Sequence, residues 1–394
     1  MGESPVAFQR MKRLGFRTAG ESHGKGLIAV LERLPAGFSV DVHAIDAMLA
    51  RRRKGFGRSA RQSMENDAVE ILTGLKRGKT IGAPLTLFVR NKDVRIDAYR
   101  ELHRPRPGHA DLAVAVKFGT KDVADVMERA SARETAARVA AGAVAVQILS
   151  VVGISVFGWV SRIGSVALGG NPEIPDAASV REASPVGSLD PEADGRAVAL
   201  IEALREAGDT VGGEFSVVAC GVPVGLGSHA EWDSRLDGRL AQALMSIPAI
   251  KSVEVGDGAQ SAMAQGLTYH DPIVPDGAGG VDRPTNRAGG IEGGISNGMP
   301  IVVRGAMKPI PTVRKPLPSI NLQTGDPEEA VWERSDVCSV PAVSVVAEAM
   351  AALVLLDALL EAVPSDALEH LLTGTDALRA RARGLTRSER PIRP

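Results

Sequence analysis

The chain has 394 residues, enough for one large domain or two ordinary ones. Hydrophobic residues make up 44% of it and charged residues 24%, which argues against a disordered protein. The formal net charge of −1 argues against a protein that binds nucleic acid mainly by neutralising phosphates.

The cysteines and the N-terminus indicate the compartment. Cys220 and Cys338 form no disulfide framework, and nothing near them has metal-site spacing, so we expect no bound metal. Both are predicted to be small buried residues in a reducing environment. Residues Met1–Gly15 lack the apolar core of a signal peptide, and we therefore expect a cytoplasmic protein.

The first predicted elements are a strand, a helix and a second strand. Leu27–Leu31 is the first strand candidate. Asp41 can cap a helix that runs to about Lys54. In Pro84–Arg90 apolar side chains alternate with others, which predicts a half-buried strand.

An uncharged stretch, Val139–Val160, is long enough to span a bilayer. Its Gln, Ser and Gly content favours a soluble interpretation. That interpretation is a helix over Glu134–Val152, a stop at Gly153, and then a strand to Val160.

Later in the chain, Gly213–Cys220 and Ile301–Met307 are predicted strands with one apolar face, which suits antiparallel sheets. The helices predicted over Glu134–Val152 and Pro341–Ala362 are apolar nearly all round, which is typical of buried helices. The predicted fold class is therefore α+β, with helices inside and sheets outside.

The rest of the chain is expected to be irregular. Residues 169–194 and 271–298 are rich in Gly, Pro and Asp, which predicts loops. No linker divides the chain, so residues 1–370 are predicted to form a single catalytic domain. Residues 371–394 are predicted to be a basic, flexible tail.

Five segments carry residues suited to chemistry. The first, residues 18–26, is a Gly-rich turn with Ser22 and His23. It differs from a phosphate-binding P-loop because Gly26 stands where Ser or Thr is required. Taken alone, His23 fits a structural role as well as a functional one.

The second segment is an arginine cluster at residues 51–61. Neighbouring helical residues point about 100° apart, so Arg51, Arg52 and Arg53 cannot all face one site. They could simply complement the helix dipole. Arg58 and Arg61 lie on a Gly-flanked loop and could converge on a phosphate or carboxylate.

The third segment is Arg104–Asp111, in which prolines stiffen the backbone and Gly108 permits a sharp turn. Arg106 and His109 are thereby held close together, which suits an acid beside an anion clamp. The alternative is a simple surface turn.

The fourth segment is Arg129–Glu134, where Ser131 and Glu134 have the spacing of a capping box. Free N–H groups at a helix start bind anions, and the flanking Arg129 and Arg133 favour such a site.

The fifth group combines the Gly-rich residues 286–298, Lys308–Thr312 and residues 334–336. A Lys, an Arg and a carboxylate beside Gly-rich backbone are expected around a phosphorylated ligand. Its prolines could alternatively mark an irregular sheet edge.

Together these motifs resemble the chorismate synthase family. GESHG, GRSAR, RPGHAD, RASARETAARVAAG, NRAGGIEGGISNG, AMKPIPT and RSDVCSVPA occur in the family order between about Arg17 and Ala362. The resemblance implies an anti-1,4-elimination of phosphate from 5-enolpyruvylshikimate 3-phosphate, giving chorismate for aromatic amino acid biosynthesis. It also implies a carbon–oxygen lyase that requires reduced FMN without net oxidation.

The family resemblance further implies a β-α-β sandwich assembled as a homotetramer, with no nucleic-acid or membrane partner. NADPH is needed only if the protein reduces its own flavin. The length resembles that of shorter members, which depend on flavin reduced elsewhere.

The resemblance also assigns roles to residues of this chain. His23 protonates the leaving phosphate, and His109 sets the charge state of the reduced flavin. Asp336, with Ser22 and Ser131, helps to remove the proton from flavin N5. The substrate clamp consists of Arg52, Arg58, Arg61, Arg106, Arg133 and Arg334. Arg52 and Arg58 also meet NADPH where it is used. FMN lies against Arg129, Ala130, Ser131, Gln260, Ser261, Gly293, Lys308, Pro309, Ile310, Pro311, Thr312 and Arg334.

Two other functions remain possible on sequence grounds. A flavin oxidoreductase would turn over redox equivalents, but no G-x-G-x-x-G motif opens a clear βαβ unit here. A nucleic-acid-binding protein could use the arginine clusters, but the charge is near zero and aromatics are only 3% of residues.

Overall fold

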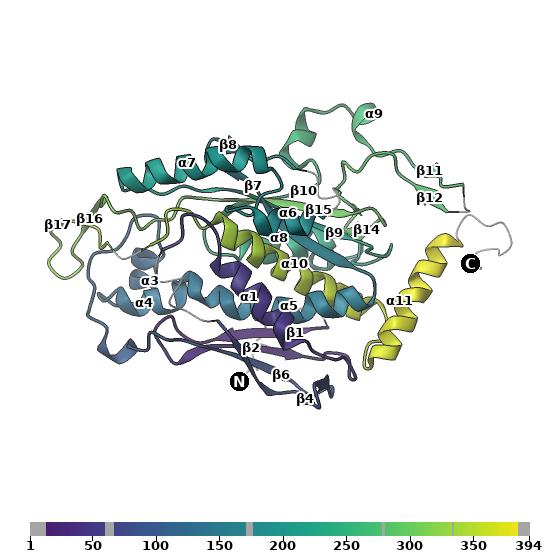
Figure 1. Cartoon of the computed structure of the whole chain (residues 1–394), viewed down its shortest axis with the longest axis horizontal. Helices are drawn as coiled ribbons and strands as arrows, with labels where there is room; N and C mark the ends of the chain where they lie inside the picture. The colour runs from purple at the N-terminus through teal and green to yellow at the C-terminus, as the bar shows by residue number, and fades with distance from the viewer. Residues whose placement is uncertain (1–12, 60–66, 171–175, 278–279, 333–334, 385–394) are drawn as a thin grey trace, which may run out of the picture.

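The computed structural model describes residues 13–59, 67–170, 176–277, 280–332 and 335–384. Helices and antiparallel strands are mixed along the chain (Figure 1). This confirms the predicted α+β class.

The first sheet has four strands in the order β1-β2-β6-β3. They are β1 (Gly15–Ala19), β2 (Gly26–Glu32), β6 (Leu85–Arg90) and β3 (Val69–Thr73), all paired antiparallel. Burial alternates along β6 as its sequence predicts, and the buried side chains are those of Leu85, Leu87 and Val89.

The second sheet has five antiparallel strands in the order β10-β15-β9-β7-β8. They are β10 (Ile250–Val255), β15 (Ile301–Met307), β9 (Gly213–Cys220), β7 (Ser155–Ile163) and β8 (Val166–Ala167). The bounds of β9 and β15 are those predicted.

Three helices pack against the strands and against one another. Helix α5 (Thr135–Val151) packs on β2 and β6, and α10 (Val340–Ala362) packs on β7 and β9. The two helices pack on each other, and α1 (Val42–Arg53) contacts both. In Figure 1 they cross the middle of the molecule. Every residue from Val340 to Leu360 is buried, as an all-round apolar helix requires.

Small side chains let α5 and α10 approach closely. A Cβ atom built on Gly142 of α5 would lie 2.6 Å from Ala349 Cα of α10, so a larger residue cannot fit there. This matches a chain with few aromatic residues.

Two segments, Ala124–Val151 and Val340–Ala362, are long and apolar enough to cross a membrane by length and composition alone. Within their tested windows, 72% and 100% of residues are buried inside the protein. Both therefore behave here as core helices.

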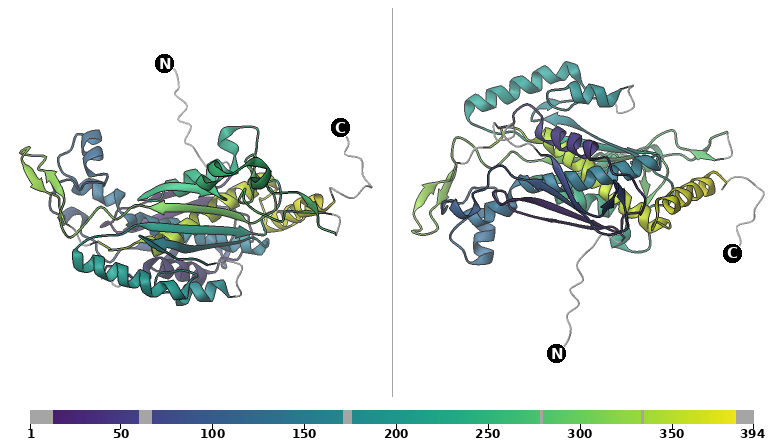
Figure 2. Two further views of the ribbon diagram at one scale, coloured as in Figure 1. Left: turned by 90° about the horizontal axis from the view of Figure 1, so that it is seen from above. Right: turned by 60° about the horizontal axis from the view of Figure 1, so that its bottom comes forward.

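The structure corrects three predictions. The predicted loop at 169–194 contains α6 (Ala177–Ala183) and the start of α7 (Pro191–Ala207). Helix α7 packs against β8 and lies along the border of the molecule in Figure 2. The tail predicted from residue 371 begins within a helix, α11 (Leu368–Arg383). Cys220 is exposed, and only Cys338 is buried.

The remaining described elements are short. They are β4 (Leu75–Lys76), β5 (Lys79–Thr80), η1 (Ile96–Ala98), α3 (Asp111–Phe118), α4 (Ala124–Ala130), η2 (Ala132–Glu134), η3 (Trp232–Ser234), α8 (Leu236–Met245), η4 (Gly258–Met263), α9 (Gly266–Tyr269), β11 (Val274–Pro275), β12 (Val281–Asp282), β13 (Ile291–Glu292), β14 (Ile295–Ser296), β16 (Pro318–Ile320) and β17 (Pro327–Glu329).

Candidate active site

His23 lies in the turn between β1 and β2 and is only 4% exposed. Its backbone N–H donates to Glu128 Oε2 at 2.7 Å, and its ring Nδ1 lies 2.6 Å from Glu128 Oε1. The other ring nitrogen, Nε2, is buried and has no hydrogen-bond partner among the described residues. Asp93 Oδ2 lies 3.8 Å from this Nε2. Glu128 thus fixes the ring and leaves Nε2 for a ligand.

Ser22 and Ser131 meet beside this histidine. Ser22 Oγ donates to Ser131 Oγ at 3.1 Å, and the Ser22 N–H donates to the Glu128 carbonyl at 2.9 Å. The turn after β1 and the C-terminal end of α4 are therefore fastened together. This arrangement places the two hydroxyls next to the His23 turn.

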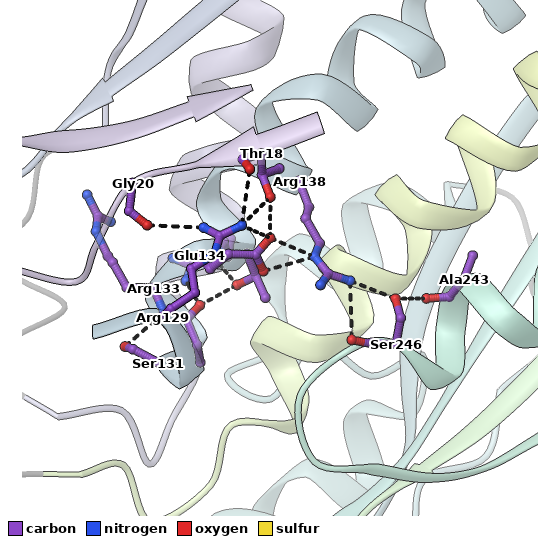
Figure 3. Close-up of polar contacts among 12 residues, drawn as sticks. Thr18, Gly20, Arg129, Ser131, Arg133, Glu134, Arg138, Ala243 and Ser246 are labelled. Carbon is purple, nitrogen blue, oxygen red and sulfur yellow. Dashed lines mark hydrogen bonds and ion pairs between the residues drawn. The ribbon is translucent and has the colours of Figure 1, made fainter. Parts of the chain in front are cut away.

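The predicted capping box at 131–134 is wrong in its details. Ser131 Oγ accepts from the Arg133 N–H at 3.2 Å and caps the 3₁₀ helix η2. The Glu134 side chain accepts from Thr18 Oγ1 at 2.8 Å and from Arg138 Nε at 2.9 Å (Figure 3). Arg138 outcompetes the backbone for this carboxylate because a charged donor makes the stronger bond.

Arg129 is half exposed and points at the end of β1. Its NH2 donates to Thr18 Oγ1 at 2.7 Å, and its NH1 donates to the Gly20 carbonyl at 3.1 Å (Figure 3). Gly20 has a φ of +104°, which favours glycine. Arg129 therefore holds the entry to the Ser22–His23 turn. Its neighbour Ala130 ends α4.

A buried arginine pair shares one carboxylate. Arg133 NH1 donates to Asp67 Oδ1 at 2.5 Å, and Arg52 NH1 lies 3.6 Å from Asp67 Oδ2. Arg52 also donates from Nε to Thr135 Oγ1 at 2.9 Å. Burial lowers the pKa of Arg52 to about 10, with Asp67 opposing and Arg133 and Arg58 adding to the shift. Arg52 is still cationic at neutral pH, so the pair carries excess positive charge suited to an anion.

Arg58 lies on the loop after α1 and is held by the segment before α10. Arg58 NH1 lies 2.6 Å from Asp336 Oδ2 and donates to Ser339 Oγ at 2.8 Å. The Ser59 N–H donates to Asp336 Oδ1 at 2.7 Å. Asp336 thus fixes both the loop and its guanidinium. Arg61 and Arg334 lie outside the described residues.

The Arg106–Asp111 loop forms a second ion cluster. Arg106 Nε donates to Asp111 Oδ2 at 2.8 Å, and His109 Nδ1 contacts Asp111 Oδ1. Burial alone would raise the pKa of Asp111, but His109 and Arg106 hold it well below its usual range. Arg106 NH1 also donates to Thr312 Oγ1 at 3.2 Å, and Lys308 Nζ donates to the Gly108 carbonyl.

Several predicted site residues are thus brought together. The charges of Arg58, Arg133 and Asp336 all affect the pKa of Arg52, so these four side chains lie in one neighbourhood. Ser335 Oγ donates to the Thr312 carbonyl at 2.6 Å, which connects this neighbourhood to the Arg106 loop. Residues Lys308–Thr312, including Pro309, Ile310 and Pro311, run past that loop after β15.

Other predicted residues are not connected to this neighbourhood by the described contacts. Ser261 Oγ donates to the Gly258 carbonyl within η4, and Gln260 on the same helix is exposed. Gly293 forms the β13–β14 turn, where a built Cβ would meet nothing within 4 Å. Arg51 turns away to Glu348, as the helical spacing predicted.

The sequence interpretation missed several partners of the site, namely Asp67, Asn91, Asp93 and Glu128. Glu128 and His23 are 105 positions apart, and Asp67 and Arg133 are 66 apart. No local pattern marks such carboxylates, because only the fold brings them to their cations.

Comparisons with known proteins identify the family of this chain. A family model described as chorismate synthase matches residues 14–360. A chorismate synthase of Brevibacillus brevis is 47% identical over 371 residues, covering 90% of this chain and 96% of that protein. One of Moorella thermoacetica is 50% identical over 366 residues, covering 90% and 95%.

A solved structure titled "Crystal Structure of Chorismate Synthase" matches with a TM-score of 0.79 and 41% identity, covering 94% of this chain and 99% of that chain. The family model matches most of this chain, and the two relatives align over nearly the whole length of both proteins. The chain therefore belongs to the chorismate synthase family.

Proposed function

We propose that this protein eliminates phosphate from 5-enolpyruvylshikimate 3-phosphate to give chorismate, as a carbon–oxygen lyase that needs reduced FMN. The observation that carries the proposal is the buried His23, whose Nε2 has no hydrogen-bond partner among the described residues, in a turn tied to the Arg133 side of the Arg52–Asp67–Arg133 cluster. The substrate has one phosphate and two carboxylates. Burying that much charge is costly unless each group is paired.

His23 supplies the acid in this proposal. The C3–O bond to phosphate and the C6–H bond both break, and no net oxidation results. Phosphate leaves poorly unless it is protonated or ion-paired, and a positioned acid typically gives ~10²–10⁴-fold. Nδ1 is engaged by Glu128, so the proton donated to the phosphate oxygen comes from Nε2.

Arginines bind the anionic groups of the substrate. Arg52, Arg58, Arg106 and Arg133 are each fixed by a carboxylate or hydroxyl, so their guanidinium groups are ordered before a ligand arrives. Each charge-assisted hydrogen bond contributes about 1.5–3 kcal/mol net. Arg61 and Arg334 complete the proposed clamp from outside the described residues.

FMN is proposed to bind near His109 and Lys308. A Cβ built on Gly108 would lie 3.5 Å from Lys308 Nζ and 3.6 Å from Pro311 Cβ, so the His109 loop and residues 308–312 are in contact. Lys308 and Arg129 are the cations proposed to hold FMN, with Ala130, Ser131, Gln260, Ser261, Gly293, Pro309, Ile310, Thr312 and Arg334. Reduced FMN, when bound, supplies electron density to the allylic system of the substrate.

His109 and Asp336 are proposed to manage protons near the flavin. His109 is in contact with Asp111 and adjoins Arg106, which orders its ring. If reduced FMN were bound here, Asp336, Ser22 and Ser131 would be the groups that take up the proton from its N5 atom. NADPH is needed only if the protein reduces its own flavin, and Arg52 and Arg58 would then meet it.

The proposal extends to the whole assembly. The contacts of α5 and α10 with opposite sheets support a β-α-β sandwich, which in this family is expected to assemble as a homotetramer. We place the enzyme in the cytoplasm, as one domain spanning residues 1–370.

An anaerobic assay tests the proposed function. Purified protein is mixed with 5-enolpyruvylshikimate 3-phosphate and chemically reduced FMN, while chorismate absorbance and phosphate release are followed. Equal amounts of both products, only with reduced flavin, are expected. Stoichiometric oxidation of NADPH with product formation would instead make the protein an oxidoreductase. A parallel arm with NADPH and oxidised FMN measures its own flavin reduction.

A further inference from the structure

Asn91 joins two parts of the site through one side chain. It follows the last residue of β6 and is 3% exposed. Its amide Nδ2 donates to the carbonyls of Glu21 at 3.0 Å and Gly24 at 2.9 Å. The Ser22 carbonyl lies 3.3 Å from the same nitrogen. One amide nitrogen therefore gathers the carbonyls on both sides of His23.

The other end of the same amide faces the arginine cluster. Asn91 Oδ1 accepts from Arg133 Nε at 2.9 Å, while Arg133 NH1 is held by Asp67. The Asn91 N–H also donates to the Lys25 carbonyl at 3.1 Å. Asn91 thus has polar contacts on every side, with no solvent to replace them.

Only an amide can make this set of contacts. The turn presents carbonyl oxygens, which need a donor, and Arg133 Nε is a donor, which needs an acceptor. Aspartate would keep the acceptor but turn a negative oxygen toward the carbonyls. Alanine would leave buried carbonyls without a partner. The turn is then expected to shift so that these carbonyls find other donors.

We propose that Asn91 is a positioning residue, which fixes the His23 turn relative to Arg133. This inference rests on the proposed function, in which His23 is the acid and Arg133 binds the substrate. The acid must reach the phosphate while the substrate is held by its other anionic groups. A displacement of about 1 Å between the two can cost on the order of 10²-fold in rate.

The test compares wild type with Asn91→Ala and Asn91→Asp in the anaerobic assay. Gln147→Ala is the matched control, because Gln147 is also an amide that bridges backbone groups, those of Asp41 near the opposite end of α5. We expect kcat to fall roughly 10–100-fold in both Asn91 variants and to stay unchanged in the control. KM should rise more for Asn91→Ala than for Asn91→Asp, which retains the acceptor for Arg133.

A double-mutant cycle separates positioning from stability. In a His23→Gln background, Asn91→Ala should lower kcat far less than it does alone, because the acid it positions is absent. Hydrogen–deuterium exchange should increase for residues 20–25, with the melting curve showing a fully folded protein at the assay temperature. Equal fold losses in both backgrounds would overturn the proposal, as would wild-type kcat in both Asn91 variants.

The result for the wild-type protein separates the proposed elimination activity from the proposed positioning role of Asn91. If wild type makes chorismate and the Asn91 variants match it, only the positioning role fails. If wild type makes no chorismate, the proposed function fails, and the positioning role fails with it.

Discussion

The pairing of His23 with Glu128 decides what this histidine can do. A carboxylate on Nδ1 orients the ring, and the buried Nε2 is the only ring atom left to meet a substrate oxygen. We predict that His23→Gln lowers kcat by ~10²–10⁴-fold while FMN still binds, because only the proton donor is lost. The anaerobic assay and a flavin titration measure the two quantities.

The control for this prediction is His370→Gln on α11, an exposed histidine remote in the fold from the β1–β2 turn. It should keep wild-type kcat. A His23→Gln variant with a kcat near wild type would remove the acid role from His23.

Asp336 gives a second prediction for a single side chain. It binds Arg58, Ser59 N–H and Ser339 together, and its side chain is 11% exposed. Asp336→Asn should raise KM and slow turnover, because Arg58 loses its ion pair and a hydrogen bond to a charged group is worth about 1.5–3 kcal/mol. The variant should remain fully folded at the assay temperature. A large fall in melting temperature would make Asp336 a structural support of α10 instead.

Single residues also show what the sequence could not reveal about the site. Motif position was enough to predict His23, Arg58 and Asp336 as candidates. The residues that hold them, such as Glu128 and Asn91, follow from tertiary contacts between segments far apart in the chain. Their roles depend on which chain segments meet, and no local spacing encodes that.

Helix α10 packs on helices α1, α5 and α8 and on strands β7 and β9, and its buried charge provides a prediction. Glu348 accepts from Arg51 NH1 at 2.9 Å and from Arg181 NH1 at 3.0 Å, so it joins α10 to α1 and α6. Glu348→Gln removes the buried carboxylate from these two largely buried arginines and leaves them only the more exposed Glu182. We predict a loss of about 3–5 kcal/mol in the free energy of unfolding, measured by urea titration.

The matched control is Glu361→Gln near the end of the same helix, where the carboxylate is 41% exposed and pairs with Arg239. Exposed pairs contribute about 0–1 kcal/mol. Equal effects of the two substitutions would contradict a special role for the buried network.

The elements also show where sequence reasoning works. Alternation of apolar side chains was enough to predict β6, β9 and β15, an almost unbroken apolar composition was enough for α5 and α10, and the Asp41 cap indicated α1. The prediction of a loop at 169–194 was wrong because it rested on the Gly and Pro content, although a helix-capping signal lies in the same segment. Asp190 accepts from the Ala193 N–H at 3.0 Å, and Pro191 stands in the first turn of α7. That start signal was present in the sequence.

For the whole molecule, buried carboxylates make stability depend on pH. Burial alone would raise the pKa of Glu348, but Arg51 and Arg181 lower it below its usual 4.5. Asp111 is likewise buried, and His109 and Arg106 lower its pKa below the usual 3.8. A carboxyl group with a lowered folded-state pKa stabilises the protein above its unfolded-state value. That stabilisation is lost as the pH falls towards the folded-state value.

We therefore predict that the free energy of unfolding is steady near neutral pH and falls steeply as the pH drops below about 4.5, because the unfolded chain then binds protons that the folded chain excludes. Asp111→Asn should be less stable than wild type at pH 7 and should lose less stability on acidification, since one of the linked groups is gone. Urea titrations of both proteins from pH 7 to pH 3 give the two slopes. Identical slopes would mean that the ion cluster on the Arg106 loop does not contribute to acid unfolding, and that other carboxylates set the acid limit of the fold.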